Sequence, residues 1–313
     1  MIGVRIMNVA IVLVTYNRLE KLKLALDKYE SQTKLPKYIL VVNNASTDST
    51  ANFLDKWKNK PVNGVNKIVL TTPKNLGGSG GFAFGIKEAC HLECDFLFLA
   101  DDDAMAEKNM LEELNKGYRK LVEKGKKVAA LCTSILNYNS YEYMHRCIVK
   151  KRMFDVKFKG LPDAEYDKEY FKIDILTFVG ACINKNAIKK IGNVKQEYFI
   201  YFDDSEFSMR LNKVGDIYCI PASIMHHDVG TNRGGTWKDY YDTRNWIDMV
   251  KEYYPRRILY GSVLIMYLKR CSLLAVIIKK RNRMYRTMCK RALRDGLQGN
   301  LGLNEIYTPG KKI

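Results

Sequence analysis

The sequence is short of acidic residues. Its 313 residues include 34 Asp and Glu against 52 Lys and Arg, so the formal net charge is +18 and the pI is near 9.4. Internal repeats and low-complexity segments are also lacking, and 47% of the residues are hydrophobic. This composition excludes a largely disordered, collagen-like or multi-span membrane protein. The excess of positive charge predicts an anionic partner, which is nucleic acid, a phosphate-bearing substrate or a membrane surface.

Two features typical of exported proteins are missing as well. None of the eight cysteines forms a Cys-x-x-Cys pair, and several lie within apolar runs. This favours buried free thiols in a reducing compartment over a set of disulfides. The apolar segment 9–14 is too short for a signal-peptide core and leads directly into polar residues. We therefore expect a cytoplasmic catalytic body.

The positive charge is concentrated at the C-terminus. Fourteen Lys and Arg between residues 256 and 313 stand against two acidic residues, so this segment, the basic tail, has a charge of +12. The first 255 residues account for the remaining +6. The sequence therefore describes a mildly basic body with a strongly basic extension.

Short apolar runs alternate with helical patterns in the first 130 residues. We expect strands at 8–14, 38–43, 67–72, 95–100 and 128–133, and helices at 19–30, 49–58, 81–91 and 107–123. The second half predicts a hairpin over 144–160, one buried strand over 173–185, and helices over 203–215 and 237–254. Strands that are apolar on both faces and joined by helices indicate a mostly parallel α/β sheet, which binds ligands beyond the carboxyl ends of its strands.

An acidic triplet, Asp101, Asp102 and Asp103, follows one of these expected strands. Three adjacent carboxylates repel one another unless a cation neutralises them. Mg²⁺ or Mn²⁺ suits such oxygen ligands and commonly shares its shell with substrate phosphates. The alternative is that one Asp caps the next helix and the others are solvated.

Three further motifs have both a functional and a structural interpretation. The glycine-rich run 75–81 precedes a helical stretch and suits a phosphate, although such a run is also an ordinary turn. Asp203 and Asp204 lie beside aromatic residues that would raise the pKa of a general base, and they equally suit a helix N-terminus. His226 ends a short strand and is either a metal ligand or a structural histidine.

Together these motifs resemble the family 2 inverting glycosyltransferases of the GT-A fold. The similar segments, within residues 8–245, are VTYNR, VVNNASTDST, NLGGSGGFAFG, LADDDA and FDDSEFSMRL. The resemblance implies a Rossmann-like, mostly parallel sheet with flanking helices. Here a basic helical extension follows it, so we expect a catalytic domain over 1–236 and a helical, membrane-associating region over 237–313.

The resemblance also implies roles for individual residues. Asp204 would be the catalytic base, and Asp101, Asp103 and His226 would bind Mn²⁺ or Mg²⁺. The nucleotide sugar would contact Thr15, Asn17, Arg18, Asn43, Asn75, Gly77, Gly78, Asp102 and Asp203, with Asn43 standing where the family often has an acid. Trp237 is interpreted as an acceptor platform, part of a mobile lid or a core residue, and Arg244 as a second acceptor contact.

The pattern is most similar to that of galactofuranosyltransferases, which implies transfer from UDP-galactofuranose to a hydroxyl of a lipid-linked or cell-surface glycan. Rhamnosyltransferases that use dTDP-rhamnose share much of it. A sugar-1-phosphate nucleotidyltransferase is a further alternative, but that class needs a glycine-rich loop directly after the first strand, and VTYNRLEK lacks one.

The basic tail has its own alternatives. Lys269 and Arg270 divide the apolar stretch 258–278 into two parts, each shorter than the roughly 20 residues needed to cross a bilayer. With flanking cations, this favours a helix lying in the headgroups at the inner face of the cell membrane. A helix packed on the body or on a second subunit of a homo-oligomer is the alternative. Binding to nucleic acid would also use cations, but no nucleic-acid motif accompanies them.

Overall fold

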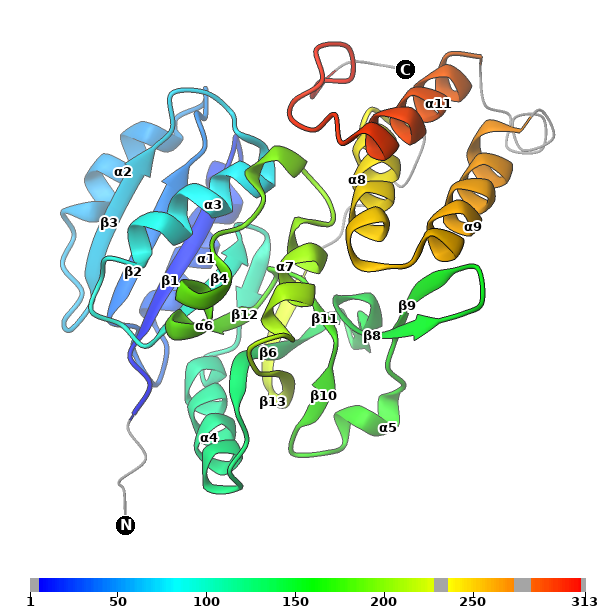
Figure 1. Ribbon diagram of the computed structural model, residues 1–313. Helices are drawn as coiled ribbons and strands as arrows, with labels where there is room; N and C mark the ends of the chain where they lie inside the picture. Colours follow the sequence, from blue (N-terminus) through cyan, green and yellow to red (C-terminus); the bar gives the residue numbers. More distant parts are fainter. Residues whose placement is uncertain (1–5, 228–235, 273–282, 311–313) are drawn as a thin grey trace.

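The computed structural model describes residues 6–227, 236–272 and 283–310 (Figure 1). Its centre is a ten-stranded sheet, whose main order is β10-β13-β6-β12-β4-β1-β2-β3. The strands are β1 (Val9–Thr15), β2 (Tyr38–Asn43), β3 (Asn66–Thr71), β4 (Phe96–Asp101), β6 (Val128–Asn137), β10 (Phe171–Ile173), β12 (Ala181–Asn184) and β13 (Asp216–His227). Two short strands, β5 (Ala104–Ala106) and β7 (Ser140–Tyr141), pair with β13 and β6.

The sheet is mixed but mostly parallel. Neighbouring strands run parallel from β3 through β2 and β1 to β4, and again between β6 and β13. The short strand β12 lies antiparallel to both β4 and β6 and joins the two halves. The predicted α/β fold with flanking helices is confirmed.

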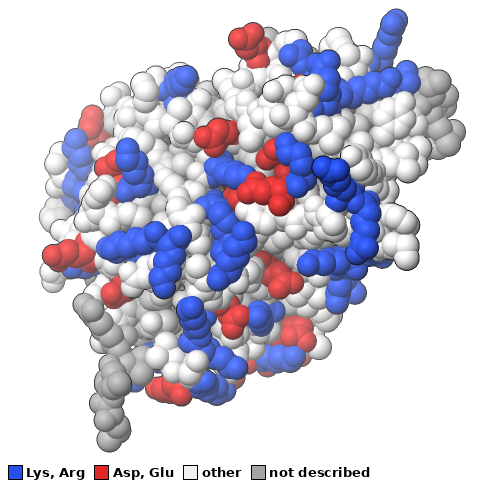
Figure 2. Space-filling view, in the orientation of Figure 1, with Lys and Arg blue, Asp and Glu red and all other residues white. Residues whose placement is uncertain are grey.

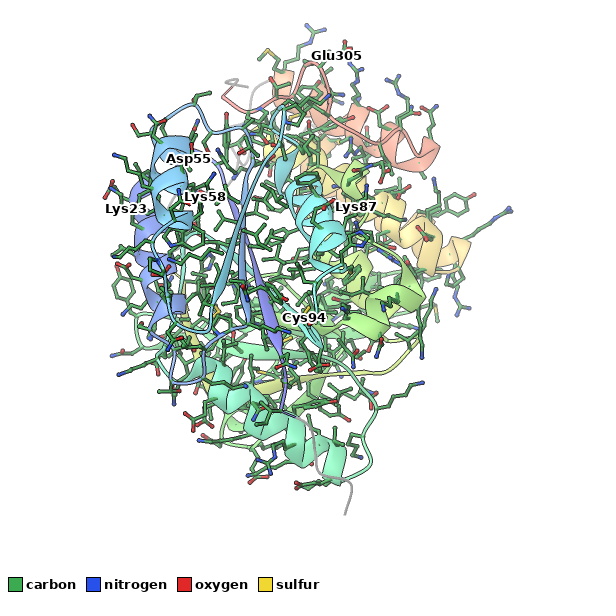
Figure 3. The ribbon with its side chains drawn as sticks, turned by 90° about the vertical axis from the view of Figure 1, so that its left-hand side faces the viewer. Lys23, Asp55, Lys58, Lys87, Cys94 and Glu305 are labelled. Atoms are coloured by element: carbon green, nitrogen blue, oxygen red, sulfur yellow. The ribbon has the colours of Figure 1, made fainter. Side chains whose placement is uncertain are left out.

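Helices cover both faces of the sheet because the strand residues alternate between two cores. Val9, Ile11 and Leu13 face the core beneath α1 (Leu19–Glu30), α2 (Thr50–Lys58) and α4 (Met110–Glu123). Ala10 and Val12 face the core beneath α3 (Gly77–Ala89), α6 (Lys185–Ile191) and α7 (Asp203–Leu211). Figure 3 shows Lys23 of α1 and Asp55 of α2 on one side of the sheet and Lys87 of α3 on the other.

Helix α3 begins earlier than expected. The glycine-rich run was predicted to precede a helix starting at residue 81, but Gly77 is already helical. Small residues allow this helix to lie close to the sheet, since a Cβ atom on Gly85 would come within 2.5 Å of Val12 Cγ1. The run therefore places the N-terminus of α3 at the sheet edge, where the Gly77 N–H donates to Asn75 Oδ1 at 2.8 Å and the Ser79 N–H donates to the Phe199 carbonyl at 3.2 Å.

The second half of the chain adds a smaller sheet. β8 (Arg146–Lys151) and β9 (Val156–Gly160) form the predicted hairpin, and β11 (Ile175–Leu176) pairs with β8. The prediction of one strand over 173–185 is wrong. The segment is divided among β10, β11 and β12 in two different sheets, with Gly180 at φ +73° directly before β12.

The described part of the basic tail packs on the protein itself. Helix α8 (Lys238–Tyr253) is followed by α9 (Arg256–Met266), a π-helical turn (Tyr267–Cys271) and α11 (Arg283–Gln298). Their buried side chains form a third core, which also includes Val156 of β9 and Phe199. Lys and Arg dominate the charged surface of these helices, in the upper right of Figure 2. No helix among the described residues is long and apolar enough to cross a membrane.

The predicted interfacial helix is only partly described. Residues 258–272 are α9 and the turn after it, and residues 273–278 lie outside the described part of the chain. All eight cysteines are free thiols in the structure, and seven of them are buried.

Candidate active site

Polar loops from four parts of the chain meet at one edge of the sheet. They surround a cavity of about 230 Å³ beyond the carboxyl ends of β1, β2 and β4. Its lining comprises Val14, Thr15, Tyr16, Arg18, Asn44, Asn75, Gly77, Gly78, Asp101, Asp102, Phe199, Ile200, Trp237, Lys238 and Pro309. Eight residues that the sequence predicted for the site are among them, and Tyr16, Asn44 and Lys238 are polar residues it missed.

Asp102 is the anchored member of the acidic triplet. Asp101 is the last residue of β4, and the turn formed by Asp102 and Asp103 leads into β5. Asp102 is 3% exposed and accepts hydrogen bonds from Thr15 Oγ1 at 2.7 Å and from the Arg18 guanidinium at 3.1 Å. Arg18 also pairs with Asp103. Arg18 therefore holds two of the three carboxylates together, and Asp102 is the one that is also fixed by Thr15.

The carboxylate of Asp101 is only partly compensated by the nearby charges of His227 and Arg18. Burial raises its pKa to about 7, and the charges of Asp103 and Asp102 add to this effect. Ionisation of this side chain is electrostatically unfavourable. A bound divalent cation would offset both the cost of burial and the repulsion by the neighbouring carboxylates. The donor set of the edge, which combines carboxylates with an imidazole, suits Mn²⁺ or Mg²⁺.

The structure separates the two neighbouring histidines of β13. His226 stands opposite Met105, and its Nε2 lies 3.0 Å from Glu107 Oε1. His227 stands opposite Ala104, and its Nε2 lies 3.6 Å from Asp103 Oδ1. Successive strand residues point to opposite faces, so only one of the pair reaches the triplet. His226, the histidine predicted as a metal ligand, therefore faces away from the acidic triplet and pairs with Glu107.

His227 belongs to a hydrogen-bonded chain. Its Nδ1 lies 3.1 Å from Glu142 Oε2, the same oxygen that lies 2.9 Å from His145 Nε2. His145 Nδ1 in turn lies 2.6 Å from Thr177 Oγ1. Within the described residues, Glu142, His145 and His227 are the group of three whose ligand atoms all lie within 4.8 Å of one another. They border a second cavity of about 960 Å³, lined also by Tyr143 and Met144.

Asp203 and Asp204 open helix α7, and neither is its N-cap, which is Phe202. Asp203 is 7% exposed, while Asp204 is less deeply buried and accepts hydrogen bonds from the N–H and hydroxyl of Ser205 at 2.6 and 3.1 Å. Burial raises the pKa of Asp204, and the charge of Asp101 raises it further. The two carboxylates at the ends of β4 and at the start of α7 therefore interact.

The loop before α7 is strained and firmly held. Phe199, Tyr201 and Phe202 all have positive φ, between 64° and 69°. The Asn245 amide donates hydrogen bonds of 2.9 Å to the carbonyls of Tyr198, Ile200 and Tyr201. Strain of this kind persists where the surroundings fix it, and it is concentrated at functional sites.

The glycine-rich helix start touches this loop. Gly77 has φ +74°, and a Cβ atom there would lie 2.1 Å from the Phe199 carbonyl oxygen. Asn44 holds the same segment from the other side, because its amide donates to the Gly77 carbonyl at 2.9 Å and accepts from the Leu76 N–H at 2.9 Å. Asn44 is therefore a residue of the site. The sequence analysis predicted a nucleotide contact at the preceding residue, Asn43, and not at Asn44.

Two residues predicted to contact the nucleotide, Asn43 and Asn17, form hydrogen bonds within the loops instead. Asn43 is 1% exposed, and its side chain accepts from the Ser46 N–H at 3.0 Å. Asn17 has φ 52°, and its side chain bonds Thr47. Neither lines the cavity, and nor does the buried Asp203.

The two predicted acceptor residues have different environments. Trp237 lines the cavity and packs near Phe199, with ring centroids 6.3 Å apart. Arg244 is 1% exposed, and its guanidinium donates to the carbonyls of Gly302, Glu197 and Tyr198. A side chain buried and saturated in this way cannot contact an acceptor, so that prediction is wrong and Arg244 is structural.

Comparison with known proteins agrees with this architecture. The model of glycosyl transferase family 2 matches residues 10–192, which include β1, α3 and the acidic triplet. The chain belongs to glycosyl transferase family 2. Two relatives are a galactofuranosyltransferase GlfT1 of Mycolicibacterium smegmatis, 26% identical over 70% of each chain, and the O-antigen chain rhamnosyltransferase WbaN of Salmonella anatum, 24% identical over 69% of this chain and 64% of that one.

Solved structures show the GT-A fold of this glycosyltransferase. GalNAc-T7 with UDP, GalNAc and Mn²⁺ has a TM-score of 0.64 at 14% identity and matches 95% of this chain and 57% of the other. S. aureus TarS 1–349 in complex with UDP-GlcNAc has a TM-score of 0.59 at 15% identity, over 93% of this chain and 81% of that one.

Proposed function

We propose that this glycosyltransferase is metal-dependent and inverting, and that it transfers galactofuranose from UDP-galactofuranose to a hydroxyl of a lipid-linked or cell-surface glycan. The observation that supports this best is the cavity beyond the carboxyl ends of β1, β2 and β4, where Asp101 and Asp102 lie beside Arg18 and the start of α3. Carboxylates next to positive charge suit a metal ion and a diphosphate, and Asp204 at the start of α7 is the candidate base.

The donor nucleotide would occupy the 230 Å³ cavity. Arg18 and Lys238 line it and supply positive charge, and the positive end of the α3 dipole lies at Gly77 and Gly78 in the same lining. The UDP and UDP-GlcNAc bound by the structural neighbours support a nucleotide sugar as donor.

We propose Asp101, Asp103 and His227 as the metal ligands, with His227 in place of the predicted His226. Glu142 would orient the His227 ring through Nδ1 and leave Nε2 for the ion, as carboxylates commonly do for ligating histidines. Bound Mn²⁺ or Mg²⁺ would supply neutralisation of the diphosphate leaving group. The Mn²⁺ in the GalNAc-T7 structure supports a divalent metal ion as the cofactor.

Asp204 would then accept the proton of the acceptor hydroxyl while that oxygen attacks the anomeric carbon. Its raised pKa makes it a better base than an ordinary aspartate, and it still loses its proton near neutral pH. A single displacement inverts the configuration at the sugar carbon. The 960 Å³ cavity beside His227 and Tyr143 is large enough to admit the acceptor glycan.

The sugar is the finer part of the proposal. GlfT1 and WbaN are similar to this chain at nearly equal identity, so rhamnose from dTDP-rhamnose is the second candidate. A panel of nucleotide sugars with Mn²⁺, scored by donor hydrolysis and transfer, distinguishes them. Turnover of UDP-galactofuranose above dTDP-rhamnose supports the proposal, and the reverse order overturns the sugar assignment alone.

We also propose that the region 237–313 attaches the enzyme to the inner face of the membrane. Exposed cations and exposed apolar residues of α9 support this arrangement. Flotation of the full chain with anionic liposomes, compared with neutral liposomes, tests it. RNA binding by the tail without liposome binding would favour the nucleic-acid alternative instead.

A further inference from the structure

A second groove, of about 400 Å³, lies between the β8–β9 hairpin and helices α8 and α9. We propose that it binds the lipid–phosphate part of the acceptor, a prenyl or acyl chain that bears a phosphate. This inference rests on the proposed transferase function. It adds a binding site for the lipid–phosphate part of the acceptor, as distinct from its glycan part.

The walls of the groove are apolar and aromatic. Trp246 is central, with its ring centroid 5.3 Å from those of both Phe158 and Phe202. Ile265 and Met266 of α9 form the opposite wall. A wall of this kind favours a hydrocarbon chain, and the volume falls in the range of ligand pockets.

Polar groups in the groove point to an anionic head on that chain. The Ser262 hydroxyl lines the groove, its side chain is 1% exposed, and it has no hydrogen-bond partner among the described residues. Buried hydroxyls are nearly always paired, so this one is suited to a ligand. Lys157 and Lys269 also line the groove and supply its positive charge, and Asp155, 4.0 Å from Lys157, offsets part of that charge.

The inner end of the groove adjoins the reaction centre. Phe202 lines it and directly precedes Asp203 and Asp204. Met144 lines both this groove and the cavity beside His227. A lipid–phosphate held here would therefore direct its attached sugar toward the proposed base.

The outer end is continuous with an exposed apolar surface. Leu264 and Leu268 of α9 and its C-terminal turn are 57% and 54% exposed, and Phe154 at the hairpin tip is 58% exposed. The hairpin and α9 form one surface, because a Cβ atom on Gly261 would overlap the Phe154 carbonyl. Figure 1 shows the hairpin directly beneath α9. A chain could enter the groove from a bilayer lying against this face.

Binding of geranylgeranyl phosphate to the full chain tests the site through Trp246 fluorescence. The part of the fluorescence change that is absent in Trp246→Phe is assigned to Trp246 and reports on the groove. We expect saturable binding that Met266→Glu weakens at least about tenfold, because it places a charge in the apolar wall. Ser262→Ala should weaken it about twofold to tenfold through loss of one hydrogen bond. Leu264→Glu, two positions away on the exposed face, is the matched control and should leave binding unchanged.

Two further probes separate the sources of binding. Inorganic phosphate and phosphatidylglycerol vesicles should leave the Trp246 signal unchanged. Equal weakening by Met266→Glu and Leu264→Glu, or a vesicle response equal to that of geranylgeranyl phosphate, would overturn the groove in favour of general bilayer contact. UDP-galactofuranose hydrolysis by the same variants should stay at the wild-type rate. Loss of donor hydrolysis in Met266→Glu alone would show that this variant is misfolded. Binding of geranylgeranyl phosphate by Ser262→Ala would then decide whether the groove is the binding site.

Discussion

His227 Nε2 lies 3.6 Å from Asp103 Oδ1, whereas the adjacent His226 points to the opposite face of β13 and pairs with Glu107. The pair of neighbours gives a matched test of the metal site. His227→Ala should lower Mn²⁺ affinity by about 100-fold or more, since it removes a ligand rather than a supporting residue. His226→Ala should leave the affinity within about twofold. Isothermal titration of Mn²⁺ into each variant measures this, and equal losses would refute the assignment.

Metal affinity should also rise with pH. Burial lowers the pKa of His227, but its hydrogen bonds to Asp103 and Glu142 outweigh this and the net effect is a raised pKa. Asp101 has a pKa raised to about 7. Both must lose their protons to bind an ion, so Mn²⁺ should displace protons and bind more weakly as the pH falls below about 7. Titrations in buffers of different ionisation enthalpy count those protons, and a flat profile from pH 6 to 8 would rule this out.

Gly77 and Gly78 offer a second matched pair. Gly77 has φ +74° and no room for a Cβ atom beside Phe199, while a Cβ atom on Gly78 meets no atom within 4 Å. Gly77→Ala should lower the free energy of unfolding by about 2–3 kcal/mol. Gly78→Ala should raise it by up to about 1 kcal/mol, as expected for a helical position. Urea unfolding of both measures the difference, and similar values would show that the contact with Phe199 is unimportant.

Arg244 should affect stability and not acceptor affinity. Its guanidinium is buried and bonds three backbone carbonyls next to the catalytic loop. Arg244→Met removes the guanidinium hydrogen bonds to Gly302, Glu197 and Tyr198, although the last two carbonyls keep backbone donors, and it should cost about 3 kcal/mol. Arg257→Met, at an exposed position of α9, is the control. A variant that melts like wild type but has a raised acceptor KM would restore the binding role.

The sequence predicted the parts of this structure that depend on local pattern. The strands predicted over 8–14 and 95–100 lie within one residue of β1 and β4, and the helix predicted over 19–30 has the bounds of α1, because these elements follow from apolar periodicity. What it missed depends on tertiary detail. The choice between His226 and His227 depends on the pairing of β13 with β5, and the burial of Arg244 depends on a contact with the distant Gly302. Neither relationship has a signal in a single sequence.

The most direct test of the mechanism is the Asp204→Asn variant, compared with wild type for donor binding and for transfer. The amide keeps the size of the side chain and its hydrogen bonds but cannot accept the acceptor proton. We expect UDP-sugar binding in the presence of Mn²⁺ to stay within about twofold, and the transfer rate to fall by about 100- to 10,000-fold. Transfer near the wild-type rate would contradict the assignment of Asp204 as the base.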